Sequence, residues 1–345
     1  MKYNQLGQSE LRVSEICLGT MTFGEQNSLG EAHEQLDVAL DRGVNFVDAA
    51  EMYPVPARAE TQGRTESILG EWLARKQRDK VVVATKIAGQ GRPITWVRGG
   101  SLAINRRNVR RAVEDSLTRL KTDYIDLYQI HWPDRYVPMF GQTAYDPSQE
   151  RNATPIAEQL SAFAELIREG KLRYIGLSNE TAWGVIEFSR VATALGLPKV
   201  VSIQNAYSLL NRSFDSSLAE AARREQLGLL AYSPLAFGLL SGKYLQGLPS
   251  DSRLALFETF GQRYRGPNVE EATRGYVKLA DELQVSPARL ALAFVRSRWF
   301  VSSTIIGATK RSQLDENLGS LELELSGEAL ARIDAIHARF PNPAP

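Results

Sequence analysis

Short runs of apolar, often β-branched residues alternate along the chain with longer segments in which apolar residues recur at every third or fourth position. The short runs predict eight strands, at residues 16–20, 45–50, 81–86, 124–131, 174–179, 201–206, 228–233 and 303–308. The longer segments predict amphipathic helices, most clearly at residues 31–43, 108–120, 155–170 and 214–226. Gly43, Gly170 and Gly228 stand where three of these helices would stop.

Strands that alternate with helices are typical of α/β proteins with a parallel sheet, and eight such pairs close a TIM barrel. A doubly wound sheet is the alternative, but no G-x-G-x-x-G motif follows any predicted strand. Residues 3–14 predict a small hairpin that plugs the opposite end of the barrel, and residues 326–340 predict an added C-terminal helix. We therefore expect residues 1–345 to form a single (β/α)8 barrel domain.

The spacing between predicted strands shows where extra chain has been inserted. Successive strands begin 29, 36, 43, 50, 27, 27 and 75 residues apart, whereas a bare βα unit takes about 30 residues. The surplus falls after strands two, three, four and seven, at residues 53–63, 89–105, 133–154 and 234–267. All four insertions lie on the strand-to-helix side, the face that carries the active site in TIM barrels.

Composition and charge narrow the possible functions. Forty-one Lys and Arg against 40 Asp and Glu give a net charge of +1, which argues against a nucleic-acid-binding protein. A single cysteine, Cys17, excludes an intrachain disulfide and a cysteine-based zinc site, and we expect it in the core. No stretch resembles a signal peptide, a membrane span or a His, Asp and Glu metal site. We expect a cytoplasmic protein without a metal or a membrane partner.

Polar residues occur at the ends of three neighbouring predicted strands. Asp48, Lys86 and His131 end strands two, three and four, and Tyr53 follows Asp48 by five residues. In a barrel these four side chains can converge. A lysine ammonium would lower the pKa of a nearby tyrosine, an aspartate would hold the lysine charged, and a histidine could orient a carbonyl oxygen. Such a set suits general acid catalysis at a developing alkoxide.

These residues lie in stretches that resemble the aldo-keto reductase superfamily, and most closely its Tas-type branch. The stretches are LGTMTFGEQ, FVDAAEMYPVPARAETQGRTE, VVVATK, DLYQIHWP, KLRYIGLSNETAWGV, QNAYSLLNR, AYSPLAFGLLSGKY and IIGATKRSQLDEN. The resemblance implies a barrel that binds NADP(H) and transfers hydride to an aldehyde or ketone. It implies a catalytic tetrad in which Tyr53 donates the proton, Lys86 lowers its pKa, Asp48 anchors Lys86 and His131 positions the carbonyl.

The resemblance also implies a set of cofactor-binding residues. Ser178, Asn179 and Gln204 would bind the nicotinamide carboxamide, and Tyr232 would stack on the nicotinamide ring. Residues 233–243, with Arg253, would form a loop across the pyrophosphate, and the residues from Gly307 to Asn317 would hold the adenosine end. Lys310, together with Arg311 near a helix N-terminus, would favour the 2′-phosphate of NADP. The whole implied set is Gly19, Thr20, Met21, Asp48, Ser178, Asn179, Gln204, Tyr232, Ser233, Pro234, Leu235, Gly238, Lys243, Arg253, Gly307, Thr309, Lys310, Gln313, Glu316 and Asn317.

Three functions are considered for a protein with these residues. The first is an NADPH-dependent carbonyl reductase, and the second is an NADP(H)-binding redox-sensing subunit that turns over slowly and acts through a protein partner. The resemblance implies that His131 disfavours the second, because channel β subunits of this superfamily generally carry another residue there. The third is a Schiff-base aldolase that uses Lys86, which Asp48 disfavours by keeping the amine charged.

An apolar and aromatic pocket is expected from Phe23, Met52, Trp132 and the loops around Trp96 and Tyr145. It favours an aromatic or medium-length aliphatic aldehyde as the small-molecule substrate. No cationic clamp for a carboxylate or phosphate is evident, although one of four loop arginines could enter the pocket, namely Arg58, Arg64, Arg92 or Arg135.

Overall fold

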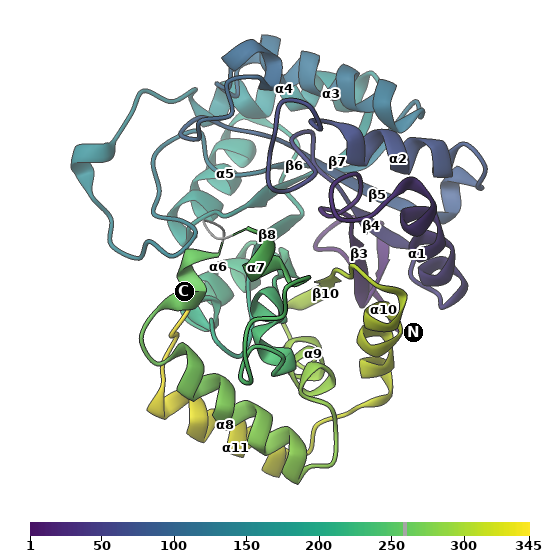
Figure 1. Ribbon diagram of the computed structural model, residues 1–345. Helices are drawn as coiled ribbons and strands as arrows, with labels where there is room; N and C mark the ends of the chain where they lie inside the picture. Colours follow the sequence, from purple (N-terminus) through teal and green to yellow (C-terminus); the bar gives the residue numbers. More distant parts are fainter. Residues whose placement is uncertain (258–260) are drawn as a thin grey trace.

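Eight parallel strands close into a barrel with helices around the outside (Figure 1) in the computed structural model, which describes residues 1–257 and 261–345. The strands follow one another around the barrel in chain order, and the last pairs with the first. They are β3 (Ile16–Gly19), β4 (Phe46–Asp48), β5 (Val82–Ile87), β6 (Ile125–Ile130), β7 (Leu172–Ser178), β8 (Ser202–Ala206), β9 (Gly228–Tyr232) and β10 (Val301–Ile306). The predicted (β/α)8 fold is confirmed, and each predicted strand overlaps one barrel strand.

Helices follow the strands and cover the outside of the barrel (Figure 1). Those of the repeating unit are α1 (Leu29–Asp41), α2 (Arg64–Leu73), α3 (Arg106–Leu120), α4 (Ile156–Arg168), α5 (Ala182–Leu195), α6 (Ser217–Arg224), α9 (Pro287–Arg296) and α10 (Arg311–Gly319). Half of these helices, and α11 (Gly327–Arg339), begin after a side chain that accepts a hydrogen bond from an amide of the first turn. The caps of this kind are Ser28, Asn105, Thr181, Ser286 and Ser326.

The segment between β9 and β10 holds more helix than the simple alternation predicts. It contains the short α7 (Arg253–Leu256) and the longer α8 (Val269–Glu282) before α9 begins. Helix α8 runs beside α11, the added C-terminal helix that the sequence predicts (Figure 1). Gly275 of α8 faces Ile336 of α11, so the apolar stripe of each helix covers the other.

One predicted helix stop is wrong. Gly43 and Gly170 have positive φ after α1 and α4, as expected, but Gly228 is the first residue of β9. Gln226 adopts the left-handed conformation after α6 instead. A Cβ at Gly228 would lie 2.1 Å from the Ser302 hydroxyl oxygen, so close packing at the start of the strand explains this glycine.

A hairpin of β1 (Tyr3–Gln5) and β2 (Arg12–Ser14) covers the amino-terminal end of the barrel. Leu6, Leu11 and Val13 are buried there against the lower interior of the barrel, where Cys17 also packs. Burial raises the pKa of the Cys17 thiol well above its ordinary value. The hairpin therefore acts as the predicted plug, and the expectation of a core position for Cys17 is confirmed.

The long loops all lie at the carboxyl ends of the strands, as the spacing predicts. Helices α2, α3, α4 and α8 begin one or two residues after the predicted insertions end. Residues 258–260, which belong to the predicted loop 234–267, lie outside the described residues. Within the described chain, no helix is long and apolar enough to cross a membrane. The open end of the barrel is therefore surrounded by long loops, and the other end is closed by the hairpin.

Helix α2 approaches α3 so closely at Gly70 that a Cβ there would lie 2.2 Å from the carbonyl oxygen of Arg119. We expect Gly70→Ala to lower the free energy of unfolding by about 1–3 kcal/mol, because the backbones must move apart. Gly30→Ala in α1 is the matched control. It meets no atom within 4 Å and should be neutral or stabilising by up to about 1 kcal/mol. Urea denaturation measures both, and equal effects would contradict the packing argument.

Candidate active site

The strands bring Asp48, Lys86 and His131 together at the open end of the barrel. Asp48 is the last residue of β4 and His131 directly follows β6, as predicted. Lys86 lies one residue before the end of β5, not at its end. Its side chain points into the barrel, as does that of Ala84 two residues earlier, because side chains alternate along a strand. All three polar residues are buried.

Lys86 and Asp48 form a buried ion pair. The Lys86 ammonium lies 2.5 Å from Asp48 Oδ2 and donates to the Ala49 carbonyl oxygen at 2.8 Å. Asp48 Oδ1 accepts hydrogen bonds from Gln129 Nε2 at 3.1 Å and Gln204 Nε2 at 2.9 Å. Burial alone would lower the pKa of Lys86, but Asp48 and Tyr53 outweigh it and raise that pKa. Lys86 therefore stays a cation at neutral pH.

Tyr53 comes from the loop after β4 and reaches the same ion pair. The Lys86 ammonium lies 4.8 Å from the Tyr53 ring centroid and also interacts with its hydroxyl. Burial raises the pKa of Tyr53 above its ordinary value, and the opposing effect of Lys86 is smaller. Lys86 thus acts on Tyr53 as predicted, by lowering its pKa, but burial outweighs this effect and the net shift is upward.

His131 packs beside Tyr53 as a neutral ring. Its ring meets the Tyr53 ring edge-on, with centroids 5.6 Å apart, and lies 4.8 Å from the Trp132 centroid. Burial lowers the pKa of His131 well below its ordinary value, and the charges of Lys86 and Arg92 add to this effect. The imidazole is therefore uncharged at neutral pH and retains one N–H to donate.

Three residues that the resemblance assigns to the nicotinamide, Ser178, Asn179 and Tyr232, lie next to the ion pair at the ends of β7 and β9. Asn179 Nδ2 donates to the His131 carbonyl oxygen at 2.9 Å, and the Tyr232 hydroxyl donates to Asn179 Oδ1 at 2.7 Å. The Ser178 hydroxyl donates to the Gln204 carbonyl oxygen at 2.8 Å. The fourth, Gln204, is already bonded to Asp48 as described above. These side chains form one connected polar surface with the candidate tetrad.

The predicted pyrophosphate loop follows β9. Lys243 lies against Gly238, where a Cβ would be 3.1 Å from the lysine Nζ. The Arg253 guanidinium lies over the Phe237 ring and contacts Gln26 Oε1 at 3.4 Å. No carboxylate pairs with Arg253 among the described residues, and burial lowers its pKa. A half-buried cation without a counter-ion is suited to an anionic ligand.

The predicted adenosine end lies at β10 and the start of α10. Gln313 Oε1 accepts from the Thr309 amide at 2.9 Å, and Asn317 Nδ2 donates to the Gly307 carbonyl oxygen at 3.2 Å. The first turn of α10 has no side-chain cap. Lys310 is bonded to Asp251 at 2.7 Å, an exposed pair that a phosphate would have to compete with.

Three more of the predicted cofactor residues lie near these groups or already form bonds with other residues. Glu316 is bonded to Ser286 and lies 3.4 Å from Arg289. Thr20 donates to the Asp48 carbonyl oxygen at 2.8 Å and so stays close to the tetrad. Gly19 ends β3 beside Gly307, where a Cβ would lie 3.9 Å from the Gly19 carbonyl oxygen, an ordinary contact distance.

The expected pocket is partly wrong. Phe23 is fully buried in the main core between strands and helices, so it lines no pocket. Met52 and Trp132 do pack with Tyr53 and Trp96 in a small apolar cluster at the open end. Two of the loop arginines considered above are paired outside the site, Arg58 with Glu25 and Arg135 with Glu180. No group of three or more His, Cys, Asp and Glu suited to a metal occurs in the described part of the chain.

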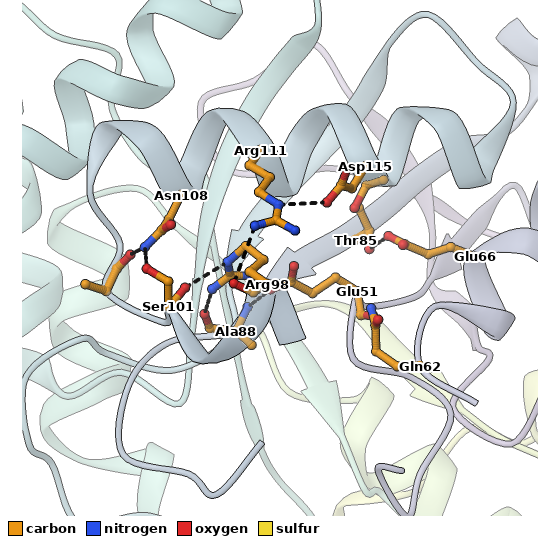
Figure 2. A network of polar contacts seen from close by, with 12 residues as sticks. Glu51, Gln62, Glu66, Thr85, Ala88, Arg98, Ser101, Asn108, Arg111 and Asp115 are labelled. Carbon is orange, nitrogen blue, oxygen red and sulfur yellow. Dashed lines mark hydrogen bonds and ion pairs between the residues drawn. The ribbon is translucent and has the colours of Figure 1, made fainter. Parts of the chain in front are cut away.

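Sequence reasoning missed a buried ion pair between Glu51 and Arg98 (Figure 2). The Glu51 carboxylate accepts from Arg98 Nη1 and from the Ala88 amide, and Arg98 Nη2 donates to the Ala88 carbonyl oxygen at 2.7 Å. The Glu51 amide also donates to the Lys86 carbonyl oxygen at 3.2 Å. The pair ties the loop after β5 to the segment that joins Asp48 and Tyr53. The sequence signal that could have indicated this pair is a glutamate, Glu51, between two apolar residues, Ala50 and Met52.

Removing one partner of this pair leaves a buried charge. We expect Arg98→Leu to lower the free energy of unfolding by about 3–5 kcal/mol, because Glu51 then lacks its counter-ion. The control is Arg190→Leu, which breaks an exposed pair with Glu187 and should cost about 1 kcal/mol or less. Chemical denaturation measures both, and similar losses would show that the Glu51–Arg98 pair contributes no more than a surface pair.

Comparison with known proteins agrees with this geometry. The Aldo/keto reductase family model matches residues 15–338. The chain is 49% identical over 347 residues to Protein tas of Escherichia coli (strain K12), covering 100% of both chains. It is 34% identical to a probable voltage-gated potassium channel subunit beta of Oryza sativa subsp. japonica, over 97% of this chain and 96% of that protein. It is 32% identical to L-glyceraldehyde 3-phosphate reductase of Escherichia coli O157:H7, over 97% and 92% respectively. This protein therefore belongs to the aldo-keto reductase family of oxidoreductases.

Proposed function

We propose that this protein is a cytoplasmic, NADPH-dependent reductase that converts aldehydes or ketones to alcohols, with Tyr53 as the proton donor. The observation that carries the proposal is the buried chain of contacts from Asp48 through Lys86 to Tyr53, beside a neutral His131. These are the groups that a carbonyl reduction needs at the oxygen atom, where negative charge develops. The family to which the chain belongs supports the same reaction class.

The residues present fit an NADP(H) molecule. The amide oxygens of Asn179 and Gln204 can accept from a planar carboxamide, whereas their amide N–H groups already donate within the protein, and Tyr232 offers an aromatic face. Arg253 and Lys243 offer cations to the diphosphate, and the uncapped start of α10 with Lys310 offers a place for the 2′-phosphate. When bound, NADPH supplies the hydride for the carbonyl carbon.

The protein's own groups handle the proton. The raised pKa keeps Tyr53 protonated at neutral pH, so it can donate to the carbonyl oxygen as that atom becomes an alkoxide. Lys86, held charged by Asp48, lies next to the phenolate that forms. Neutral His131 donates a hydrogen bond that orients the carbonyl oxygen. The apolar cluster of Met52, Trp96 and Trp132 keeps this region dry, which strengthens these interactions.

A redox-sensing subunit is the second candidate, because one relative is named as a potassium channel subunit beta. Such a protein would bind NADPH but consume it slowly, so turnover distinguishes the two candidates. The raised pKa of Lys86 disfavours the Schiff-base aldolase, because a nucleophilic lysine must lose its proton.

Replacing the proposed proton donor tests the function directly. We expect the protein to consume NADPH with a panel of aldehydes, and Tyr53→Phe to lose a factor of about one hundred or more in kcat. NADPH binding should change little, because the ring remains. Tyr276→Phe is the control, since it removes a buried hydroxyl without a partner among the described residues, in α8 outside the site. Tight NADPH binding without consumption in the unaltered protein would instead favour the redox-sensing subunit.

The pH dependence tests the protonation states. Tyr53 must be protonated for reduction, and its pKa lies above the ordinary value of about 10. His131 must be neutral, and its pKa lies well below about 6.5. We therefore expect kcat for reduction to be flat between about pH 6.5 and about pH 9, and kcat for alcohol oxidation to rise with pH because it needs the phenolate. An ionisation within that window in the reduction direction would contradict these assignments.

A further inference from the structure

Three long loops meet above the candidate active site around the ring of Phe140. Phe140 belongs to the loop after β6, and its ring centroid lies 4.8 Å from the Arg92 guanidinium carbon, in the loop after β5. The Arg263 guanidinium carbon, in the loop after β9, lies 5.6 Å from the same centroid. A Cβ at the neighbouring Gly141 would lie 2.9 Å from the Cβ of Arg263, which shows how close the last two loops are. Arg92 and Arg263, termed the arginine pair below, thus share one aromatic ring.

The arginine pair lies next to the groups proposed to carry the chemistry. The Arg92 guanidinium carbon lies 5.6 Å from the centroid of Trp132, whose ring packs on His131. Burial raises the pKa of Tyr232, and the nearby charge of Arg263 opposes this shift. The two cations therefore flank the entrance to the tetrad, one on the His131 side and the other on the Tyr232 side.

Neither arginine has a carboxylate within 4.0 Å in the parts of the chain that the structure describes. This distinguishes them from Arg58 and Arg135, each of which is paired with a glutamate. Asp134, the acidic group at the base of the loop after β6, is occupied by Gln90 and by the amide of Thr154.

Glu51 is likewise bound by Arg98. Arg92 and Arg263 are both half-buried, so they have lost part of their hydration, and no carboxylate of the described residues lies close enough to compensate for it. An anionic group on a ligand would compensate for this lost hydration.

The stacking arrangement leaves the right atoms free for such a ligand. A guanidinium that lies over an aromatic ring uses its face, and its N–H groups remain at the edge. Those N–H groups form paired hydrogen bonds with the oxygen atoms of a carboxylate or a phosphate. Each guanidinium group of the arginine pair is therefore held at the Phe140 ring with N–H groups that can bind an oxyanion.

We infer that Arg92 and Arg263 bind an anionic group, a carboxylate or a phosphate monoester, on the far end of the carbonyl substrate. The inference rests on the proposed reductase function and specifies its substrate class. The anionic group takes no part in the reaction. The carbonyl carbon gains hydride from NADPH, the oxygen gains the proton from Tyr53, and the oxyanion stays bound to the arginine pair. The expectation of a neutral aromatic or aliphatic aldehyde is replaced by an aldehyde or ketone that carries a negative charge.

Matched substrates test the inference. The ratio of kcat/KM for 4-carboxybenzaldehyde to that for its neutral methyl ester reports recognition of a carboxylate. The ratio for glyceraldehyde 3-phosphate to glyceraldehyde reports recognition of a phosphate. We expect at least one ratio to exceed about tenfold in the unaltered protein, since a charge-assisted bidentate contact readily contributes that much. Arg92→Gln and Arg263→Gln should each reduce the ratio about tenfold, mainly through the KM of the charged substrate.

Arg58→Gln is the matched control. It removes one positive charge from a neighbouring loop, but this arginine is already paired with Glu25, so the ratio should not change. The Kd for NADPH is measured for each variant. If Arg92→Gln and Arg263→Gln weaken NADPH binding and leave the substrate ratio unchanged, the arginine pair serves the cofactor and the inference is wrong.

Failure of the inference and failure of the proposed function give different results. Ratios near one in a protein that reduces the neutral aldehydes would overturn the inference and leave the reductase function in place. A protein that reduces none of these compounds would contradict the function. Binding of 4-(hydroxymethyl)benzoate and of its neutral amide, measured by tryptophan fluorescence, then tests whether the arginine pair binds the carboxylate. Equal affinities would overturn the inference, and tighter binding of the anion that is lost in Arg92→Gln would support it.

Discussion

The buried ion pair between Lys86 and Asp48 is the interaction on which the rest of the site depends. Removing two charges from water costs several kcal/mol per ion unless hydrogen bonds and mutual attraction compensate. Here Lys86 also donates to the Ala49 carbonyl, and Asp48 also accepts from Gln129 and Gln204. These partners all lie on or directly after strands of one closed barrel, so the strand register fixes their positions. Below this polar layer the barrel interior is apolar and the hairpin closes it. The charged groups thus have one open direction, toward the loops.

The fold could be predicted because its signals are local. A run such as residues 81–86 shows its strand within a few positions, and the distance to the next run shows how much loop follows. Contacts between distant segments were harder to predict. Helix α8 has its own amphipathic pattern, but its apolar face packs against α11 outside the barrel. Helix α11 follows about fifty residues later in the chain, so this contact is not visible locally. Gly228 was misread for the same reason, since the Ser302 side chain that excludes a Cβ belongs to a neighbouring strand.

The same difference between local signals and contacts of distant segments applies to the candidate site. Positions at strand ends located Asp48, Lys86 and His131, because a barrel brings those ends together whatever the loops do. Burial and pairing between loops could not be seen from the chain. Phe23 therefore turned out to be core, and the Glu51–Arg98 pair was missed. Of the arginines considered for the pocket, the structure brings Arg92 to the mouth. Its companion Arg263 had not been considered, because its nearness to Phe140 exists only when two insertions meet.

The upward shift in the pKa of Tyr53 suits a proton donor better than the expected downward shift. Burial disfavours the phenolate, so the hydroxyl keeps its proton until a stronger base, the developing alkoxide, is in place. At that moment Lys86 favours the phenolate, and its ammonium is already fixed by Asp48, so no solvent or side chain has to reorganise. Burial therefore keeps the Tyr53 hydroxyl protonated before the reaction, and the fixed Lys86 ammonium lowers the energy of the phenolate that forms during it. A solvent-exposed tyrosine beside a lysine would have a lower pKa, but the lysine would be screened by water and would stabilise the phenolate less. The cost of burying the Lys86–Asp48 pair is thus linked to the proposed chemistry, because the same low polarity that makes the pair expensive makes its field strong at the tyrosine oxygen.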